Sequence, residues 1–391
     1  MKAIKRILPL GIAAIMAAAV PFQAAAGSPD FARSAEEWEK LQDDIIEYDE
    51  LADLIHEYNA TVQKNNIDLN EFRKDYGDSN QKWADRYREL ARDIRNDIEY
   101  PDPVADSAAY GSKLAAVISQ EKQIDNYLKQ ADDAVEDSTI WYLTYQSAEA
   151  TLVSSAQSNL ISYYQDQLKL QKALLQQELQ QENYQSALTR QSVGTATAVD
   201  VLNAQESLRS TEQTIIENRS GIETVREKLC VMLGWKHDDM PQIGELPKPD
   251  MDKIAAMAPA ADKAQAMENN YTLRINKRKL ENAQSTDKKA SLETTVRENE
   301  QSIGASLTAS YQSVLSAQTG YELAVSQAEL EQRNFQTASR NYELGTMSRL
   351  KYVTQKNTTE IAQVSVKIAE LNLLQAIENY QWAVNGLASA S

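Results

Sequence analysis

Few side chains in this sequence are of the kinds that catalyse reactions or bind metals. The chain has 2 histidines, His56 and His237, and 1 cysteine, Cys230. Nothing pairs either histidine with a cysteine or a carboxylate at a metal-ligand spacing. The sequence also lacks a G-x-S-x-G elbow, a Walker loop and a glycine-rich dinucleotide fingerprint. We therefore expect no enzymatic activity, no cofactor and no metal site, and we interpret Cys230 as a core residue.

The charge of the chain and its first residues limit its partners and its location. There are 57 acidic and 40 basic residues, which gives a formal net charge of −17. Lys2, Lys5 and Arg6 precede an apolar run at 7–20 and a small-residue cleavage pattern that ends at 26. This order is typical of a secretory signal peptide, and its removal takes the charge to about −20. An acidic exported chain has no electrostatic reason to bind nucleic acid.

The low glycine and proline content predicts long helices. Neither residue type occurs between 112 and 193, so we expect helix over most of this stretch, with a weak point at 137–139. A return helix is predicted over 197–233. Its apolar side chains recur every seven residues, as in a coiled coil: Val201, Leu208, Ile215, Ile222 and Leu229.

Shorter elements are predicted before and after this pair. The S-x-x-E pattern at 34–37 predicts a helix start, and we expect that helix to continue toward Phe72 and to break at Gly77. A further helix is predicted over 80–99. Beyond a proline-containing linker at 234–260, helices are predicted over 261–284, 290–343 and 348–384.

The two halves of the chain repeat the same order of residues. Gly194 and Gly345 are separated by 345 − 194 = 151 positions, and the same offset relates Asn183 to Asn334. An upstream block at 57–62 resembles 268–273. Such duplication is the mark of an architecture built from equivalent units.

The repeat divides the chain into segments. We assign 1–26 to the signal peptide, 27–233 to the first helical-hairpin repeat, 234–260 to the linker and 261–391 to the second repeat. Asn59 lies 194 − 59 = 135 residues before its turn glycine, whereas Asn270 lies 345 − 270 = 75 before the other. The first repeat therefore carries an insertion near 76–140, and its residues favour helix.

The two glycine turns resemble the hairpin-tip motif of the TolC-like outer-membrane efflux family. The first copy reads Ser192-Val193-Gly194-Thr195 and the second Tyr342-Glu343-Leu344-Gly345-Thr346. The resemblance covers about 52–75, 141–234 and 261–387. It implies a homotrimer in which each protomer adds two antiparallel hairpins to an α-barrel. It also implies two partners, a periplasmic-adaptor-like (membrane fusion) protein and a membrane transporter that supplies the energy.

The sequence departs from this family in one respect. The resemblance places β-barrel strands near 76–140 and 285–300, but neither segment shows the alternating apolar pattern of membrane strands. We therefore expect an all-α chain without those strands. The sequence leaves open whether the protein associates with a membrane, and it favours the cell envelope, whether periplasm, outer membrane or cell surface.

The resemblance also suggests candidate gate residues at the tips. It maps the acid of the first tip to Asp200 and its tyrosine partner to Tyr342. Met347 occupies the position where the family usually has the basic partner. Lys351 and Thr354 occupy the positions where the family has a ring of acids, so this sequence retains only part of the family's gate.

Each candidate also has a simpler interpretation. Arg349 and Lys351 offer new cationic partners for Asp200, but both side chains are equally suited to a solvated surface. Asp200 is equally an acid in the first turn of a helix. Gly194 with Thr195, and Gly345 with Thr346, serve the backbone geometry of the turns.

We therefore predict a TolC-like conduit for efflux or export, with passive conduction coupled to a partner transporter through an adaptor. The alternative is a secreted or cell-surface structural or adhesive coiled-coil protein without transport activity. An α-helical pore-forming toxin is a third hypothesis, but the chain lacks the long apolar hairpin that such a toxin needs.

Overall fold

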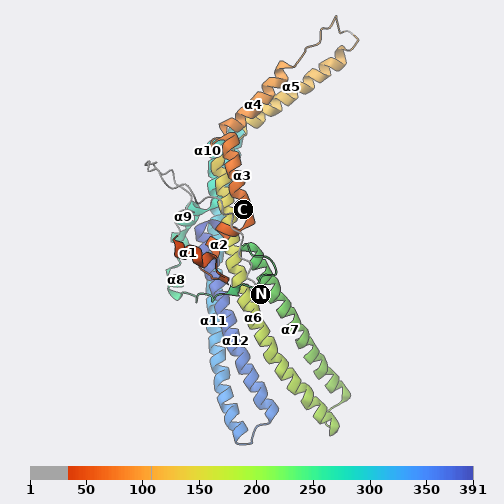
Figure 1. Cartoon of the computed structure of the whole chain (residues 1–391), viewed down its shortest axis with the longest axis vertical. Coiled ribbons are helices and arrows are strands. Elements are labelled where there is room, and N and C mark those ends of the chain that lie inside the picture. Colours follow the sequence, from red (N-terminus) through yellow and green to blue (C-terminus); the bar gives the residue numbers. More distant parts are fainter. Residues whose placement is uncertain (1–33, 107, 391) are drawn as a thin grey trace.

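The computed structural model describes residues 34–106 and 108–390, so the predicted signal peptide lies outside the described residues. Four long helices dominate it: α6 (Ser138–Ser192), α7 (Ala198–Met232), α11 (Thr286–Glu343) and α12 (Arg349–Trp382). They form two antiparallel hairpins whose turns lie at the same end of the molecule (Figure 1). The predicted all-α class is confirmed, because the described residues form only two short strands.

The first long hairpin packs along the predicted seven-residue seam. Val201, Leu208, Ile215 and Leu229 of α7 are buried, and Ile222 is half-buried. With 55 residues, α6 extends over about 80 Å at 1.5 Å per residue. The Gly- and Pro-free sequence thus produces an uninterrupted rod.

Shorter elements surround the middle of these rods. They are α1 (Ala35–Leu41), α2 (Leu51–Tyr58), α8 (Met251–Ala256) and α9 (Pro259–Asn269), with the strands β1 (Ile45–Ile46) and β2 (Gln242–Ile243). The two strands pair in parallel and tie the N-terminal segment to the linker. A final π-helical turn, η2 (Ala383–Leu387), follows α12.

The prediction of one helix from Ser34 toward Phe72 is wrong. The capping box at Ser34 is present, but α1 ends at Leu41 because the following residues pair with β2. A separate helix, α3 (Ala60–Tyr76), then begins after Asn59. The predicted helix over 261–284 is likewise broken, into α9 and α10 (Tyr271–Asn282), at Asn270.

Asn59 and Asn270 mark equivalent helix breaks in the two repeats. The buried Asn59 side chain accepts the Thr61 N–H at 2.9 Å and donates to the Met232 carbonyl at 2.8 Å. The buried Asn270 side chain accepts the Leu273 N–H at 2.9 Å and donates to the Ala388 carbonyl at 2.8 Å. Each asparagine therefore caps one helix and holds the end of a return helix.

Close to each of these asparagines, a glycine allows two segments of backbone to approach closely. Gly234 has φ +84, and a Cβ there would lie 2.5 Å from Tyr58 Cβ. Gly386 has φ +116, and a Cβ there would lie 2.7 Å from the Asn269 carbonyl oxygen. Only glycine combines this backbone conformation with so close an approach. We call each pair, Asn59 with Gly234 and Asn270 with Gly386, an Asn–Gly latch.

The latches lie beside two apolar cores. The first includes the fully buried Leu54, Leu160 and Leu229, and the second includes Leu273, Leu307 and Leu373. We call this region, with α1–α3 and α8–α10, the body. The distal hairpins, 174–228 and 315–366, bury far fewer side chains, and several of these are small or polar.

The segment at 76–140 folds into a third hairpin, formed by α4 (Gln81–Asn96) and α5 (Tyr110–Asp132). It projects from the body at the end opposite the long-hairpin turns (Figure 1). Its base is held by the fully buried Asp137, which accepts hydrogen bonds from Arg278 Nε at 2.6 Å and Asn282 Nδ2 at 2.8 Å. Residues 286–300 belong to α11.

None of the helices that the structure describes is both long enough and apolar enough to cross a bilayer.

Candidate functional site

The two distal turns share one backbone design. In the first, the Thr195 N–H donates to the Arg190 carbonyl at 2.8 Å and the Gly194 N–H to the Gln191 carbonyl at 3.0 Å. The second turn repeats both bonds, from Thr346 to Asn341 and from Gly345 to Tyr342. This pattern is a Schellman motif, which requires a left-handed residue at the glycine. Gly194 and Gly345 have φ +77 and +73.

The threonine after each glycine adds a side-chain bond. Thr195 Oγ1 donates to the Arg190 carbonyl at 3.0 Å, and Thr346 Oγ1 donates to the Asn341 carbonyl at 2.9 Å. The repeated Gly-Thr pair therefore closes the end of each outgoing helix.

The two return helices begin differently. At the first tip, Thr197 and Asp200 form a capping box, in which Asp200 Oδ2 accepts the Thr197 N–H at 2.7 Å. Hydrogen bonds from the Thr197 backbone and hydroxyl lower the pKa of Asp200. The carboxylate is thus held ionised at the positive end of α7. This geometry matches the helix-start interpretation of Asp200.

The equivalent position at the second tip carries the opposite charge. Ser348 caps α12, and its hydroxyl accepts the Lys351 N–H at 3.4 Å. The lysine side chain cannot accept a hydrogen bond from the Ser348 N–H in return, so this tip has no capping box. Lys351 lies 351 − 200 = 151 positions after Asp200, so the repeat inverts a charge at the same helical position. A lysine in a first helical turn opposes the helix dipole. Its own helix therefore gains nothing from this charge.

The other two candidate residues have partners within the chain. Arg349 Nη2 lies 2.9 Å from Glu182 Oε1, which joins α12 to α6 across the two hairpins. The Tyr342 ring stacks on Tyr352 of its own hairpin, with ring centroids 4.5 Å apart. Within one protomer, no hydrogen bond or ion pair therefore joins Asp200 to Tyr342, Arg349 or Lys351 among the described contacts.

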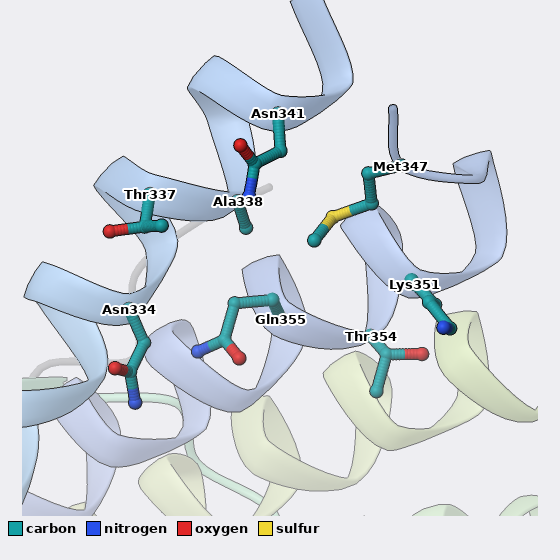
Figure 2. Close-up of a pocket in the computed structure, with 8 residues that line it drawn as sticks. All are labelled: Asn334, Thr337, Ala338, Asn341, Met347, Lys351, Thr354 and Gln355. Carbon is teal, nitrogen blue, oxygen red and sulfur yellow. The ribbon is translucent and has the colours of Figure 1, made fainter. Parts of the chain in front are cut away.

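A groove lies between α11 and α12 just behind the second turn (Figure 2). Asn334, Asn341 and Gln355 supply amide groups, Met347 supplies an apolar surface, and Lys351 lies at one edge. The amides can donate and accept hydrogen bonds, and the lysine only donates. The groove therefore combines hydrogen-bonding amides and one positive charge with an apolar surface.

The contact between the two long hairpins is polar along much of its length. Gln165 donates to Asn372 at 2.9 Å, and Gln375 donates to Ser158 at 3.1 Å. Closer to the tips, Lys356 and Glu178 approach to 4.0 Å, and the amide of the fully buried Asn357 has no hydrogen-bond partner. An unsatisfied buried amide weakens its surroundings by about 1–3 kcal/mol.

Sequence reasoning missed Glu182 and Glu178 as partners of the tip cations. Both lie in a stretch at 176–182 that consists of Gln and Glu with a single Leu, so no apolar periodicity marks which side chains face α12. Their pairing depends on how two separate hairpins are rotated about their axes. In the part of the chain that the structure describes, no group of three or more His, Cys, Asp or Glu side chains is arranged to hold a metal.

Comparison with known proteins identifies the fold. No protein-family model matches the chain, and no curated protein matches its sequence. Solved structures do match. The outer-membrane channel OprN has a TM-score of 0.56 at 14% identity, over 95% of this chain and 98% of that one.

Two further structures agree. A membrane protein from Pseudomonas aeruginosa matches with a TM-score of 0.55 at 13% identity, over 87% of this chain and 90% of that one. The open-state outer-membrane channel MtrE of Neisseria gonorrhoeae matches with a TM-score of 0.51 at 10% identity, over 88% and 90%. The chain therefore has the fold of TolC-like outer-membrane channels, as its tip motifs suggested.

Proposed function

We propose that this chain is the conduit component of a trans-envelope efflux or export system. The observation that carries the proposal is the pair of Schellman turns, which lie at one end of two parallel rods and have opposite charges at equivalent positions. Paired rods with matched tips are suited to a closed ring. We propose that three copies close such a ring and enclose a passive conduit.

The inverted charge supports the closure of this ring at its tips. In a ring of three chains the first and second hairpins alternate, so Asp200 of one chain can meet Lys351 of the next. Asp200 is already satisfied by its own helix, whereas Lys351 has no acid within the described chain. The lysine is therefore the member of the pair that depends on a neighbour. We propose this contact, with Tyr342 and Arg349 beside it, as the gate.

We further propose the partners and the location. An adaptor would dock on the exposed tips, and a membrane transporter would supply the energy, since no nucleotide-binding motif occurs in this chain. We propose that the protein lies in the cell envelope, which its likeness to solved outer-membrane channels supports.

The test begins with stoichiometry. Sedimentation of the mature protein at micromolar concentration should give a trimer, and a compact monomer would exclude a conduit. Leakage of ions or solutes through the trimer should then be measured with a planar bilayer or a swelling assay.

Three variants separate the gate from the helix cap. Asp200→Ala should raise leakage with little change in melting temperature. Asp200→Asn keeps an oxygen that can accept the Thr197 N–H but removes the charge, so it should leak to a similar extent. The exchange of both charges, Asp200→Lys with Lys351→Asp, should restore the closed state. If leakage is unchanged in all three, Asp200 serves only the start of α7.

A further inference from the structure

The α4–α5 hairpin has an uncovered side that the conduit does not explain. Each of the two helices packs extensively only against the other. Its buried seam consists of Ala84 and Ala91 on α4 with Val117, Ile124 and Ala131 on α5. These mostly small side chains let the helices approach closely, but they bury little apolar area.

A second stripe runs beside this seam on both helices. On α4 it comprises Trp83, Tyr87, Leu90 and Ile94, and on α5 it comprises Ala116, Gln120, Gln123 and Tyr127. Both sets follow the same spacing of four, three and four residues, which places each set on one helix face. The rings of Tyr87 and Tyr127 stack with centroids 6.3 Å apart, so the two stripes lie on the same side of the hairpin. We call this the uncharged side, because none of its residues carries a charge.

The opposite side of the hairpin is charged. Arg88, Arg92 and Arg95 of α4 share a face, and Glu121, Asp125 and Asp132 of α5 share another. Arg88 lies 3.7 Å from Asp132, which places these two faces together. Further charges lie on the outer faces of the two helices, such as the ion-paired Arg86 and Glu89, so the uncharged side is one stripe of an otherwise charged hairpin.

A helix with two adjacent apolar stripes is typical of a bundle with more than two helices, because each stripe packs against a different neighbour. Here one stripe is used within the hairpin. Trp83, Tyr87, Leu90 and Ile94 remain half-buried, and Gln123 is exposed. Trp83 packs against Phe72 and Tyr76 of α3, so a further neighbour would cover mainly Tyr87, Leu90 and Ile94.

We propose that the uncharged side of the α4–α5 hairpin binds the same side of this hairpin in a second copy of the chain. The chain has a net charge of −17, so two copies repel each other wherever carboxylates meet. The uncharged side brings no carboxylate against another. Glutamine amides both donate and accept hydrogen bonds, so Gln120 and Gln123 are complementary to their own counterparts.

The same features argue against other occupants. A partner recognised by charge needs complementary charges, and this side has none. A lipid surface suits Trp83 and Tyr87, but it leaves Gln120 and Gln123 without partners in an apolar medium. The second copy is the occupant that satisfies both the apolar and the amide side chains.

The test uses site-specific disulfides in the full-length mature chain. Gln123→Cys lies on the uncharged side, and Lys122→Cys is its matched control, exposed one residue away on a different face. A disulfide requires Cα atoms within about 7 Å, so on mild oxidation Gln123→Cys should form covalent dimers at least roughly ten-fold faster than Lys122→Cys. The unmodified chain, with its buried Cys230, gives the baseline.

A second substitution checks that the contact depends on the uncharged side. Leu90→Glu places a carboxylate within the stripe and should reduce the Gln123→Cys cross-link about ten-fold, whereas Asn126→Glu adds the same charge on the outer face and should not. Circular dichroism of each variant confirms that the helices remain. Equal cross-linking at 122 and 123, or none at 123, overturns the proposal.

The outcome also distinguishes this interface from the proposed conduit. A trimer without the 123 cross-link retains the conduit and overturns the hairpin contact. A cross-link without a trimer retains the contact and removes the conduit. Vesicles of phosphatidylcholine with phosphatidylglycerol provide the last arm. If they cosediment with the unmodified protein but not with Leu90→Glu, and position 123 does not cross-link, a lipid surface is the occupant and the proposal fails.

Discussion

The body and the distal hairpins are built from the same four long helices, but they are held together differently. In the body, large aliphatic side chains such as Leu160, Leu229 and Leu307 are fully buried, and the Asn–Gly latches bring backbones into close contact. In the distal hairpins the buried set includes Ala338, Asn357 and other small or polar side chains. The difference shows that one continuous helix can be rigidly packed at one end and loosely packed at the other.

The largest effect is expected at a latch glycine. Gly234→Ala should destabilise the chain by about 3 kcal/mol or more, because left-handed strain and overpacking each cost about 1–3 kcal/mol. Gly194→Ala is the matched control, since Gly194 has a similar φ but no atom within 4 Å of the added Cβ. It should cost only about 1–2 kcal/mol. Urea unfolding of both variants measures the difference, and equal midpoints would show that the latch is not close-packed.

A smaller difference is expected within a single seam. Leu229→Ala in the body should cost about 3–4 kcal/mol, because its rigid surroundings leave a cavity. Ile215→Ala lies on the same stripe of α7 in the distal hairpin and should cost about 2 kcal/mol, since loosely packed neighbours can close the gap. Thermal or urea unfolding tests this order. A larger loss at Ile215 would contradict the assignment of the distal hairpin as the looser region.

The third prediction concerns pH and Glu50, which lies in the body at the start of α2. Both of its carboxylate oxygens are buried without a hydrogen-bond partner. Burial, together with the nearby Glu47 and Asp43, raises the pKa of Glu50. The folded chain therefore keeps this proton at pH values where the unfolded chain has lost it. The free energy of unfolding should fall as the pH rises from the ordinary glutamate range through the raised pKa.

Glu50→Gln should remove this pH dependence. The variant and the unmodified protein should have similar stability in acid, and the variant should be more stable at neutral pH by about 1 kcal/mol or more, because a buried unsatisfied charge is removed. Asp49→Asn, at the exposed neighbouring position, is the control and should change little. A constant difference between Glu50→Gln and the unmodified chain at all pH values would exclude this role for Glu50.

The smallest effect on stability is expected at the tip ion pair. Arg349 and Glu182 have side chains that are 73% and 31% exposed, so Arg349→Ala should change the free energy of unfolding by only about 0–1 kcal/mol. A double-mutant cycle with Glu182→Ala measures the coupling. If the pair holds the two hairpins together, leakage should rise in either single variant with little change in melting temperature. A large loss of stability would instead place this pair among the structural contacts of the body.

Some features of the sequence determine the structure locally and were therefore predictable. Gly194 and Gly345 end their helices because a left-handed residue is needed there. The shared offset between the two repeats predicted that both turns have the same structure. The seven-residue seam of α7 was equally readable, since a packed face requires that period.

Other features depend on contacts between distant segments. Asn59 and Asn270 occur within continuous helical patterns, and their roles arise only when the ends of α7 and α12 reach them. The 57–62 and 268–273 blocks were recognised as a repeat, yet nothing local showed that each marks a helix break. Arg349 pairs with Glu182 because of how the two hairpins are rotated about their own axes, and the residue pattern of a single helix does not specify that rotation.

The latches lie at one end of long helices whose other ends form the tips. From Met232 beside the first latch, α7 extends over 35 residues to the tip, a lever arm of about 50 Å at 1.5 Å per residue. A rotation of about 5° at such a pivot moves the tip by about 4 Å, which is comparable to the width of a side chain. Displacements too small to break the body's packing are thus amplified at the far end. The close contacts at Gly234 and Gly386 therefore bear on the position of tips that lie far from them.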